Sequence, residues 1–214
     1  MHRRRRTALL LAAAITAAPL LTACGNEAHP GAAAVVGGQR ITVAQLENRV
    51  TEVREAQRAA VPDEAQYQQV IAKTGTLTRD TLHNMVLDRV LRRAAQDAGV
   101  TVSRKEIQQM RSGLEQQTGG SKALETAWLQ QYGIAPARLD DNLRLQLEAQ
   151  KLASKLGTDT RNPAFWNALA EASKKLGIDL NPRYGAWDVQ KSTRVDAKTP
   201  WVREVTAAGT QQTT

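Results

Sequence analysis

LHNMVLDRVLRRAAQDAGVTVSRKEIQQMRSGL occupies residues 82–114, ALETAWLQQYG residues 123–133, and PARLDDNLRLQLEAQKLASKL residues 136–156. Apolar residues recur in each at intervals of three or four, which predicts three successive amphipathic patterns with helical periodicity. Ser103 and Glu106 form a capping box at a helix start, and glycines end the patterns. The stretch contains no nucleophile motif, metal-ligand spacing or phosphate loop, which favours a binding role over catalysis.

The segments on both sides of this stretch predict further helices and a small sheet. Ala33–Val36 and Gln39–Thr42 read as strands joined by a Gly37-Gly38 turn. Thr42 and Gln45 form a second capping box, and an extended segment is expected at 178–181. Helices are expected at about 43–58, 62–73, 78–98 with Thr78 as its N-cap, 103–118, 121–132 capped by Ser121, 136–156 and 163–176.

The N-terminal residues have the pattern of an export signal. Arg3 to Arg6 are followed by an apolar run at residues 8–21 and by Leu-Thr-Ala-Cys at 21–24. Small residues before a single cysteine resemble the lipobox of bacterial lipoproteins, which implies that Cys24 is acylated after removal of residues 1–23. Alternatives are an ordinary signal peptide with an incidental thiol, or a spanning helix, although the apolar run is shorter than the roughly 20 residues that cross a bilayer. Both the twin-arginine and the general export routes remain open.

Removal of this leader changes what the net charge implies. It takes away four of the 29 basic residues and none of the 21 acidic ones, so the net charge falls from +8 to +4. Nucleic-acid binding then loses its compositional support. Cys24 is the one cysteine, so no disulfide can form within the chain.

The composition divides the remaining chain into three parts. Residues 24–32 are small, polar or Pro/Gly and predict a flexible tether. Residues 33–188 carry the periodic patterns and predict one folded domain. Residues 189–214 are polar and largely without pattern, and we expect a disordered tail there.

Three ordered features resemble a known family. VVGGQRIT (35–42), LHNMVLDRVLRRAAQDAGVTVSRKEIQQ (82–109) and WLQQYGIAPARLDDNLRLQLEAQKL (128–152) are similar to the N-terminal domain of SurA- and PrsA-type extracytoplasmic foldase chaperones. The resemblance implies a mainly α (α+β) helical bundle with a small sheet. A C-terminal piece packs back on this domain in the family, so residues 178–181 are expected to pair with Ala33–Val36.

One departure from the family bears on activity. A parvulin-type prolyl isomerase domain follows the closing helix in many members, but 25 residues separate Gly157 from Arg183 here. That spacing is too short for such a domain. We therefore expect no isomerase activity, no catalytic residue, no cofactor and no metal.

The residues expected in a client-binding cleft are Met85, Met110, Leu114, Trp128 and Tyr132, because thioethers and amphipathic rings adapt to varied apolar peptides. Core packing is the alternative for each of them. His83 is interpreted as structural or surface-exposed, and Asp140 and Asp141 as first-turn acids favoured by the helix dipole. Arg79, Arg89, Arg92 and Arg93 are interpreted mainly as a solvated helix face, and contact with lipid head groups or acidic clients is the alternative.

Taken with the resemblance, these patterns predict a protein anchored by lipid on the extracytoplasmic face of the cell membrane. It would bind unfolded or partly folded exported polypeptides, and its membrane contact would be through the lipid on Cys24. The alternative is an adaptor module for one specific envelope protein. The oligomeric state is not determined by the sequence.

Overall fold

The computed structural model describes residues 31–197. The predicted leader, Cys24, the tether up to residue 30 and the part of the tail from residue 198 lie outside the described residues. The helices are α1 (Val43–Ala60), α2 (Glu64–Lys73), α3 (Leu77–Asp97), α4 (Arg104–Thr118), α5 (Ser121–Tyr132), α6 (Leu139–Lys155) and α7 (Pro163–Leu176), with 3-10 turns η1 (Pro136–Arg138) and η2 (Pro182–Tyr184). The strands are β1 (Ala32–Val36), β2 (Gln39–Thr42), β3 (Ile178–Leu180), β4 (Ala186–Asp188) and β5 (Thr193–Val195).

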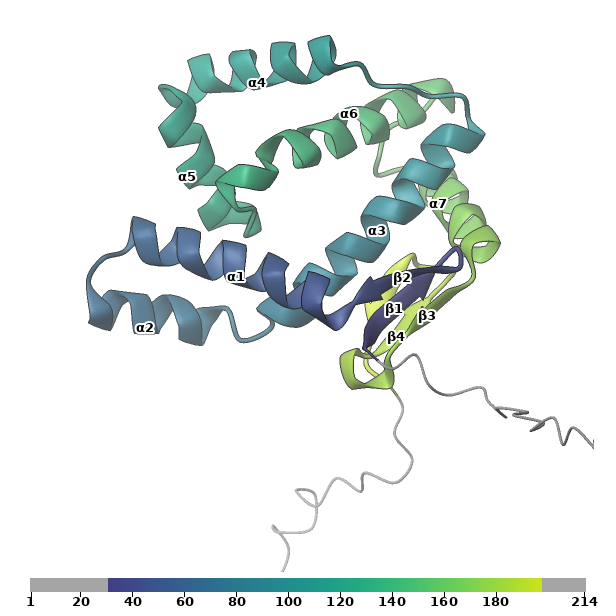
Figure 1. The fold of residues 1–214 in the computed structure, drawn as a ribbon. Helices are drawn as coiled ribbons and strands as arrows, with labels where there is room; N and C mark the ends of the chain where they lie inside the picture. Colours follow the sequence, from purple (N-terminus) through teal and green to yellow (C-terminus); the bar gives the residue numbers. More distant parts are fainter. Residues whose placement is uncertain (1–30, 198–214) are drawn as a thin grey trace, which may run out of the picture.

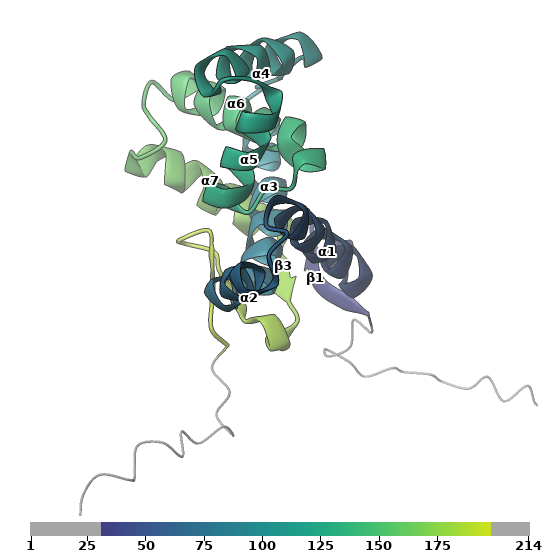
Figure 2. The same ribbon diagram turned by 90° about the vertical axis from the view of Figure 1, so that its left-hand side faces the viewer.

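Helix α3 connects all parts of the molecule. In Figure 1 it runs diagonally between a lower arm, made of α1 and α2, and an upper arm, made of α4, α5 and α6. Helix α7 and the strands lie at the opposite end from the tips of the arms, and Figure 2 shows the upper arm above α1 and α2 from the side. No helix within residues 31–197 combines the length and apolar character needed to cross a bilayer.

The two ends of the folded region meet in one sheet of strand order β2-β1-β3. Gly37 and Gly38 have φ of 61° and 74°, which suits the tight turn between β1 and β2. Strand β3 pairs antiparallel with β1, with Ala34 opposite Leu180 and Val36 opposite Ile178. The predicted pairing of the C-terminal segment with Ala33–Val36 is therefore confirmed, as is the mainly helical fold class with a small sheet.

The folded domain continues beyond residue 188, so the predicted start of a disordered tail is wrong at this boundary. β5 pairs antiparallel with β4, and the hairpin docks on α3 and α7. The backbone N–H of Arg194 donates to Nδ1 of His83 at 3.3 Å, and Nε1 of Trp187 donates to Oγ of Ser173 at 3.3 Å. Strands of three residues are too short to show a periodic pattern, and the residues that hold this hairpin in place are far from it in the sequence.

Both predicted capping boxes are confirmed. The Thr42 and Ser103 hydroxyls accept from the backbone N–H groups of Gln45 and Glu106, whose side chains accept in return. The predicted cap at Thr78 is wrong. Helix α3 starts at Leu77, without a side-chain cap. The hydroxyl of its N-cap residue, Thr76, donates to the carboxylate of Asp80 at 2.6 Å. Thr76 has right-handed helical backbone angles, whereas a residue whose side chain caps a helix is usually extended. Likewise Ser121 is the first residue of α5 and Gly120 takes the cap position.

The apolar stripe of α3 lies in the main core. Leu82, Val86 and Val90 are fully buried there with residues of β1, α1, α6 and α7. A second cluster joins α1, the start of α3, α5 and the segment after α5, and consists of Val53, Leu77, Leu129 and Ala135. A third, of Ile107, Leu124, Leu139 and Leu143, fills the upper arm.

Arg111 ties the three helices of the upper arm together. Its guanidinium donates to Glu115 on α4 at 2.8 Å, to Glu125 on α5 at 3.0 Å and to Asp140 on α6 at 2.8 Å. Asp140 and Asp141 lie in the first turn of α6, as the sequence predicted. The upper arm therefore has both an apolar core and a polar link between its helices.

Candidate functional site

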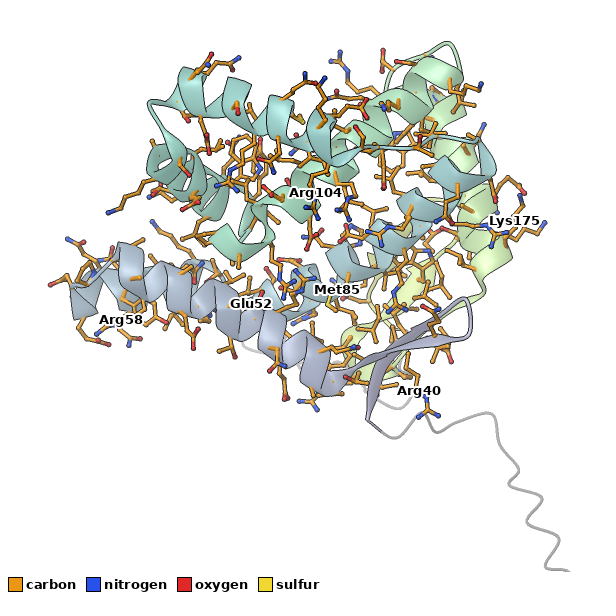
Figure 3. The ribbon with its side chains drawn as sticks, turned by 45° about the horizontal axis from the view of Figure 1, so that its top comes forward. Arg40, Glu52, Arg58, Met85, Arg104 and Lys175 are labelled. Atoms are coloured by element: carbon orange, nitrogen blue, oxygen red, sulfur yellow. The ribbon has the colours of Figure 1, made fainter. Side chains whose placement is uncertain are left out.

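A continuous cleft lies between the two arms, with α3 as its floor. Three adjoining cavities of about 410, 70 and 490 Å³ form it, and Arg49, Asp88 and Arg138 line all three. Figure 3 labels Glu52 on α1 and Met85 on α3, both of which line this interarm cleft. One end of the cleft is polar and the other is apolar.

The arms are joined across the cleft by one ion pair. Nε and Nη2 of Arg138, which follows α5, donate to the two carboxylate oxygens of Glu52 on α1 at 2.8 and 2.6 Å. Hydrogen bonding to Arg138 lowers the pKa of Glu52, so this carboxylate stays ionised. Such bidentate pairs fix geometry as well as charge, and this one supplements the apolar cluster of Val53, Leu77, Leu129 and Ala135.

A half-buried carboxyl group, Asp88, and a buried one, Glu148, lie in or near the cleft, and neither forms an ion pair within the described part of the chain. Asp88 on α3 lines the cleft, and burial raises its pKa from 3.8 to about 7, against an opposing effect of Arg49 and Arg92. Glu148 on α6 is 8 % exposed, and its Oε2 atom has no hydrogen-bond partner among the described residues. Burial raises the pKa of Glu148 as well. Desolvation disfavours the charged form of both groups.

The apolar end of the cleft is the largest of the three cavities. Its wall comes from α3, from the end of α5 with the segment that follows, and from α6. Tyr132 stands at this end with half of its surface exposed (50 %). The apolar side chains that line this cavity are those of Leu87, Leu91, Tyr132, Ile134, Leu145 and Ala149.

The structure divides the residues expected to bind clients into two groups. Met85 and Tyr132 line the interarm cleft. Met110, Leu114 and Trp128 pack on the core of the upper arm, and Nε1 of Trp128 donates to Oδ1 of Asn142 at 3.0 Å. The rings of Trp128 and Tyr132 meet edge to face, with centroids 5.5 Å apart. The two groups are thus in contact, although three of the five residues serve the arm core.

Sequence reasoning missed the residues that α3, the α5–η1 connection and α6 contribute to the apolar end. Leu87 and Leu91 widen the apolar face of α3 beyond what one neighbouring helix can cover. This width is visible in the sequence and could have indicated a second contact surface. Ile134, Leu145 and Ala149 carried no comparable signal, because an apolar residue at helical spacing predicts burial and not which neighbour covers it.

His83 and most of the arginines near it have structural partners. The His83 ring stacks on Trp187 with centroids 5.6 Å apart, and burial with the charge of Arg194 lowers the pKa of His83. Arg89 donates to the carbonyl oxygens of Gln39 and Arg40 at 3.0 and 3.3 Å. Arg93 pairs with Asp97 on its own helix, and Arg79 lies 3.8 Å from Asp196. Arg89 and Arg92 both line the polar end of the cleft, but Arg92 forms no hydrogen bond or salt bridge within residues 31–197.

Comparison with known proteins identifies a family for most of this chain. A family model described as the SurA-like N-terminal domain matches residues 2–153. The match ends within α6 and leaves out α7 and strands β3 to β5. No curated protein and no solved structure matches the chain.

Proposed function

We propose a function from one premise: the chain belongs to the SurA-like N-terminal domain family, whose model matches more than half of its length. Membership indicates a chaperone-type protein concerned with protein folding. The proposed function is to bind unfolded or partly folded exported polypeptides in the interarm cleft, without ATP and without prolyl isomerase or other enzymatic activity. The observation that carries it is an apolar cavity of about 490 Å³ continuous with a polar one.

The shape and lining of the cleft suit an adaptable binding site. Apolar burial depends on area and does not read sequence, so a cavity lined by leucines and a half-exposed tyrosine can accept different side chains. Tyr132 adds a ring that offers large contact area at low entropic cost. Weak binding of many clients follows from such a surface.

Tyr132→Ser should weaken suppression of client aggregation. The purified protein, added in stoichiometric amount to a chemically unfolded exported protein on dilution, is expected to reduce light scattering. The variant should need about fivefold more protein for the same effect, because truncating one aromatic contact costs about 1 kcal/mol. Tyr132 is exposed, so helicity by circular dichroism should stay unchanged.

The matched control is Trp166→Ser on α7, which removes another exposed aromatic residue (40 %) outside the cleft. It should leave suppression unchanged. Equal losses in both variants would contradict a role for the cleft. No suppression of several unrelated clients by the unaltered protein would contradict general client binding and favour the adaptor function for one envelope protein.

The proposal includes a lipid anchor on Cys24 at the extracytoplasmic face of the membrane. Its support is the charged start, apolar run and Leu-Thr-Ala-Cys sequence at residues 21–24. Cys24→Ser should move the protein from the membrane fraction to the soluble fraction, and labelled fatty acid should no longer be incorporated. Persistence of Cys24→Ser protein in the membrane fraction after a salt wash, or a wild-type chain free of label, would refute the anchor.

A further inference from the structure

Two arginines at the polar end of the cleft interact within the fold through charge alone: both act on Asp88, Arg49 also acts on Glu52, and Arg92 on Glu148. Arg49 on α1 and Arg92 on α3 both line the cavity of about 410 Å³. Neither guanidinium forms a hydrogen bond or salt bridge within residues 31–197. The other two arginines in this wall are engaged, Arg138 by Glu52 and Arg89 by two carbonyl oxygens. Two of the four guanidinium groups therefore have all their N–H donors available for a ligand.

The remainder of the wall gives the cavity a net positive charge. Glu52 is neutralised by Arg138. Asp88 is the other acid in the wall, and its burial favours the uncharged form up to about neutral pH. Gln45 and Asn48 are exposed at the mouth and can donate from their amides.

We infer that this cavity binds an acidic side chain of a client polypeptide, with Arg49 and Arg92 as its carboxylate ligands. The inference rests on the proposed function and names the chemistry that the cleft prefers. A guanidinium presents a planar fork of donors that matches a carboxylate. A cavity that bound peptides through apolar contacts alone would not need a pair of arginines.

The polar cavity adjoins the apolar one, which indicates that the bound acidic side chain belongs to an internal residue of the client polypeptide. The polar cavity shares Arg49, Asp88 and Arg138 with the apolar one, so residues on one side of the acid can enter the apolar end. Exposed residues at the mouth leave room for the polypeptide to continue outward on the other side. The preferred segment therefore carries Asp or Glu next to apolar residues.

Binding should also depend on pH through Asp88. As pH rises past about 7 this carboxyl ionises and repels a bound carboxylate, so the preference for an acidic segment should decrease. The charged groups that act on Asp88 or line its cavity are Arg49 and Glu52 of α1, Arg89 and Arg92 of α3, Arg138 of η1, and Asp141 and Glu148 of α6.

The test compares three labelled peptides by fluorescence anisotropy with the purified protein at pH 6.5. One has a central Glu flanked by leucines, with acetylated and amidated ends, the second has Gln in place of Glu, and the third is the Gln peptide with a free C-terminal carboxylate. We expect the Glu peptide to bind about tenfold more tightly than the blocked Gln peptide, the effect of one charge-assisted contact of about 1.4 kcal/mol.

Variants assign this preference to the two arginines. Arg49→Gln and Arg92→Gln should each reduce the Glu-to-Gln affinity ratio from about ten to near one. Both variants should fold, since neither guanidinium forms a hydrogen bond or salt bridge within residues 31–197 and neither residue is buried. Arg104→Gln, on an exposed residue of α4 that lines none of the three cavities, is the matched control and should retain the difference. In Asp88→Asn the Glu-to-Gln affinity ratio should be the same at pH 6 and pH 8.

Each other outcome has a distinct meaning. Equal binding of the Glu and blocked Gln peptides, with both weakened by Tyr132→Ser, would overturn the acidic preference and leave the proposed function standing. Tighter binding of the free-ended Gln peptide alone would assign the site to chain ends and overturn the inference. Absence of binding by all three peptides, together with no suppression of aggregation, would overturn the proposed function as well.

Discussion

Leu82→Ala is expected to lower the free energy of unfolding by about 3 kcal/mol, since deletion of buried leucine atoms loses transfer free energy and leaves a cavity. Leu82 has no exposed surface and lies in the cluster that α3 shares with β1, α1, α6 and α7. Because all these elements meet on α3, the loss should affect the whole fold. Urea unfolding followed by circular dichroism would show a lower midpoint with an unchanged slope.

Leu156→Ala is the matched control for this prediction. Leu156 directly follows α6 and is 41 % exposed, so the same chemical change should alter the free energy of unfolding by less than about 0.5 kcal/mol. A cost below about 1 kcal/mol for Leu82→Ala would contradict a tightly packed core around α3. Such a result would mean that the neighbouring elements can close the cavity at little cost.

The sequence predicted the elements whose signals are local. Thr42 with Gln45 and Ser103 with Glu106 mark helix starts through reciprocal hydrogen bonds three residues apart, and such contacts can be read without a fold. The pairing of residues 178–181 with β1 was predicted from the family resemblance and not from a local signal. Pro182 limits a strand beyond that point, in agreement with the short β3.

The cleft could be predicted only in part, because helical spacing identifies apolar faces without identifying their partners. Met110 and Trp128 have the same spacing whether they line a cleft or pack within the upper arm, and the structure places both on the arm core. Arg49 carried no signal either. Arg49 and Arg92 line one cavity only because α1 crosses α3 at a particular angle, and the sequence of neither helix determines that angle.

The hairpin of β4 and β5 is the clearest failure of local reasoning, and it leads to the second prediction. Gly185 has φ of 118°, a backbone conformation that residues with a Cβ rarely adopt. A Cβ at this position would lie inside the contact distance of the Val195 carbonyl oxygen and 2.9 Å from Nη1 of Arg194. The close approach of β5 to this turn therefore requires glycine.

Gly185→Ala is expected to cost about 2–4 kcal/mol, or to detach the hairpin altogether, because backbone strain of about 1–3 kcal/mol adds to a steric clash with β5. Detachment would break the bond from the Arg194 amide to His83 and expose the Trp187 ring that stacks on this histidine. Hydrogen exchange of the Arg194 amide should then become at least about tenfold faster, since about 1.4 kcal/mol of local stability corresponds to that factor.

Gly113→Ala separates this effect from the general consequence of replacing glycine. Gly113 lies within α4 at negative φ, and a Cβ there would meet no atom within 4 Å. Alanine should therefore stabilise the protein by about 0.5–1 kcal/mol, since it loses less backbone entropy in a helix. Opposite signs for the two substitutions would show that the constraint at Gly185 comes from β5. Unchanged stability and unchanged Arg194 exchange in Gly185→Ala would instead mean that residues 186–195 do not dock on α3 and α7, and that the folded domain ends before β4.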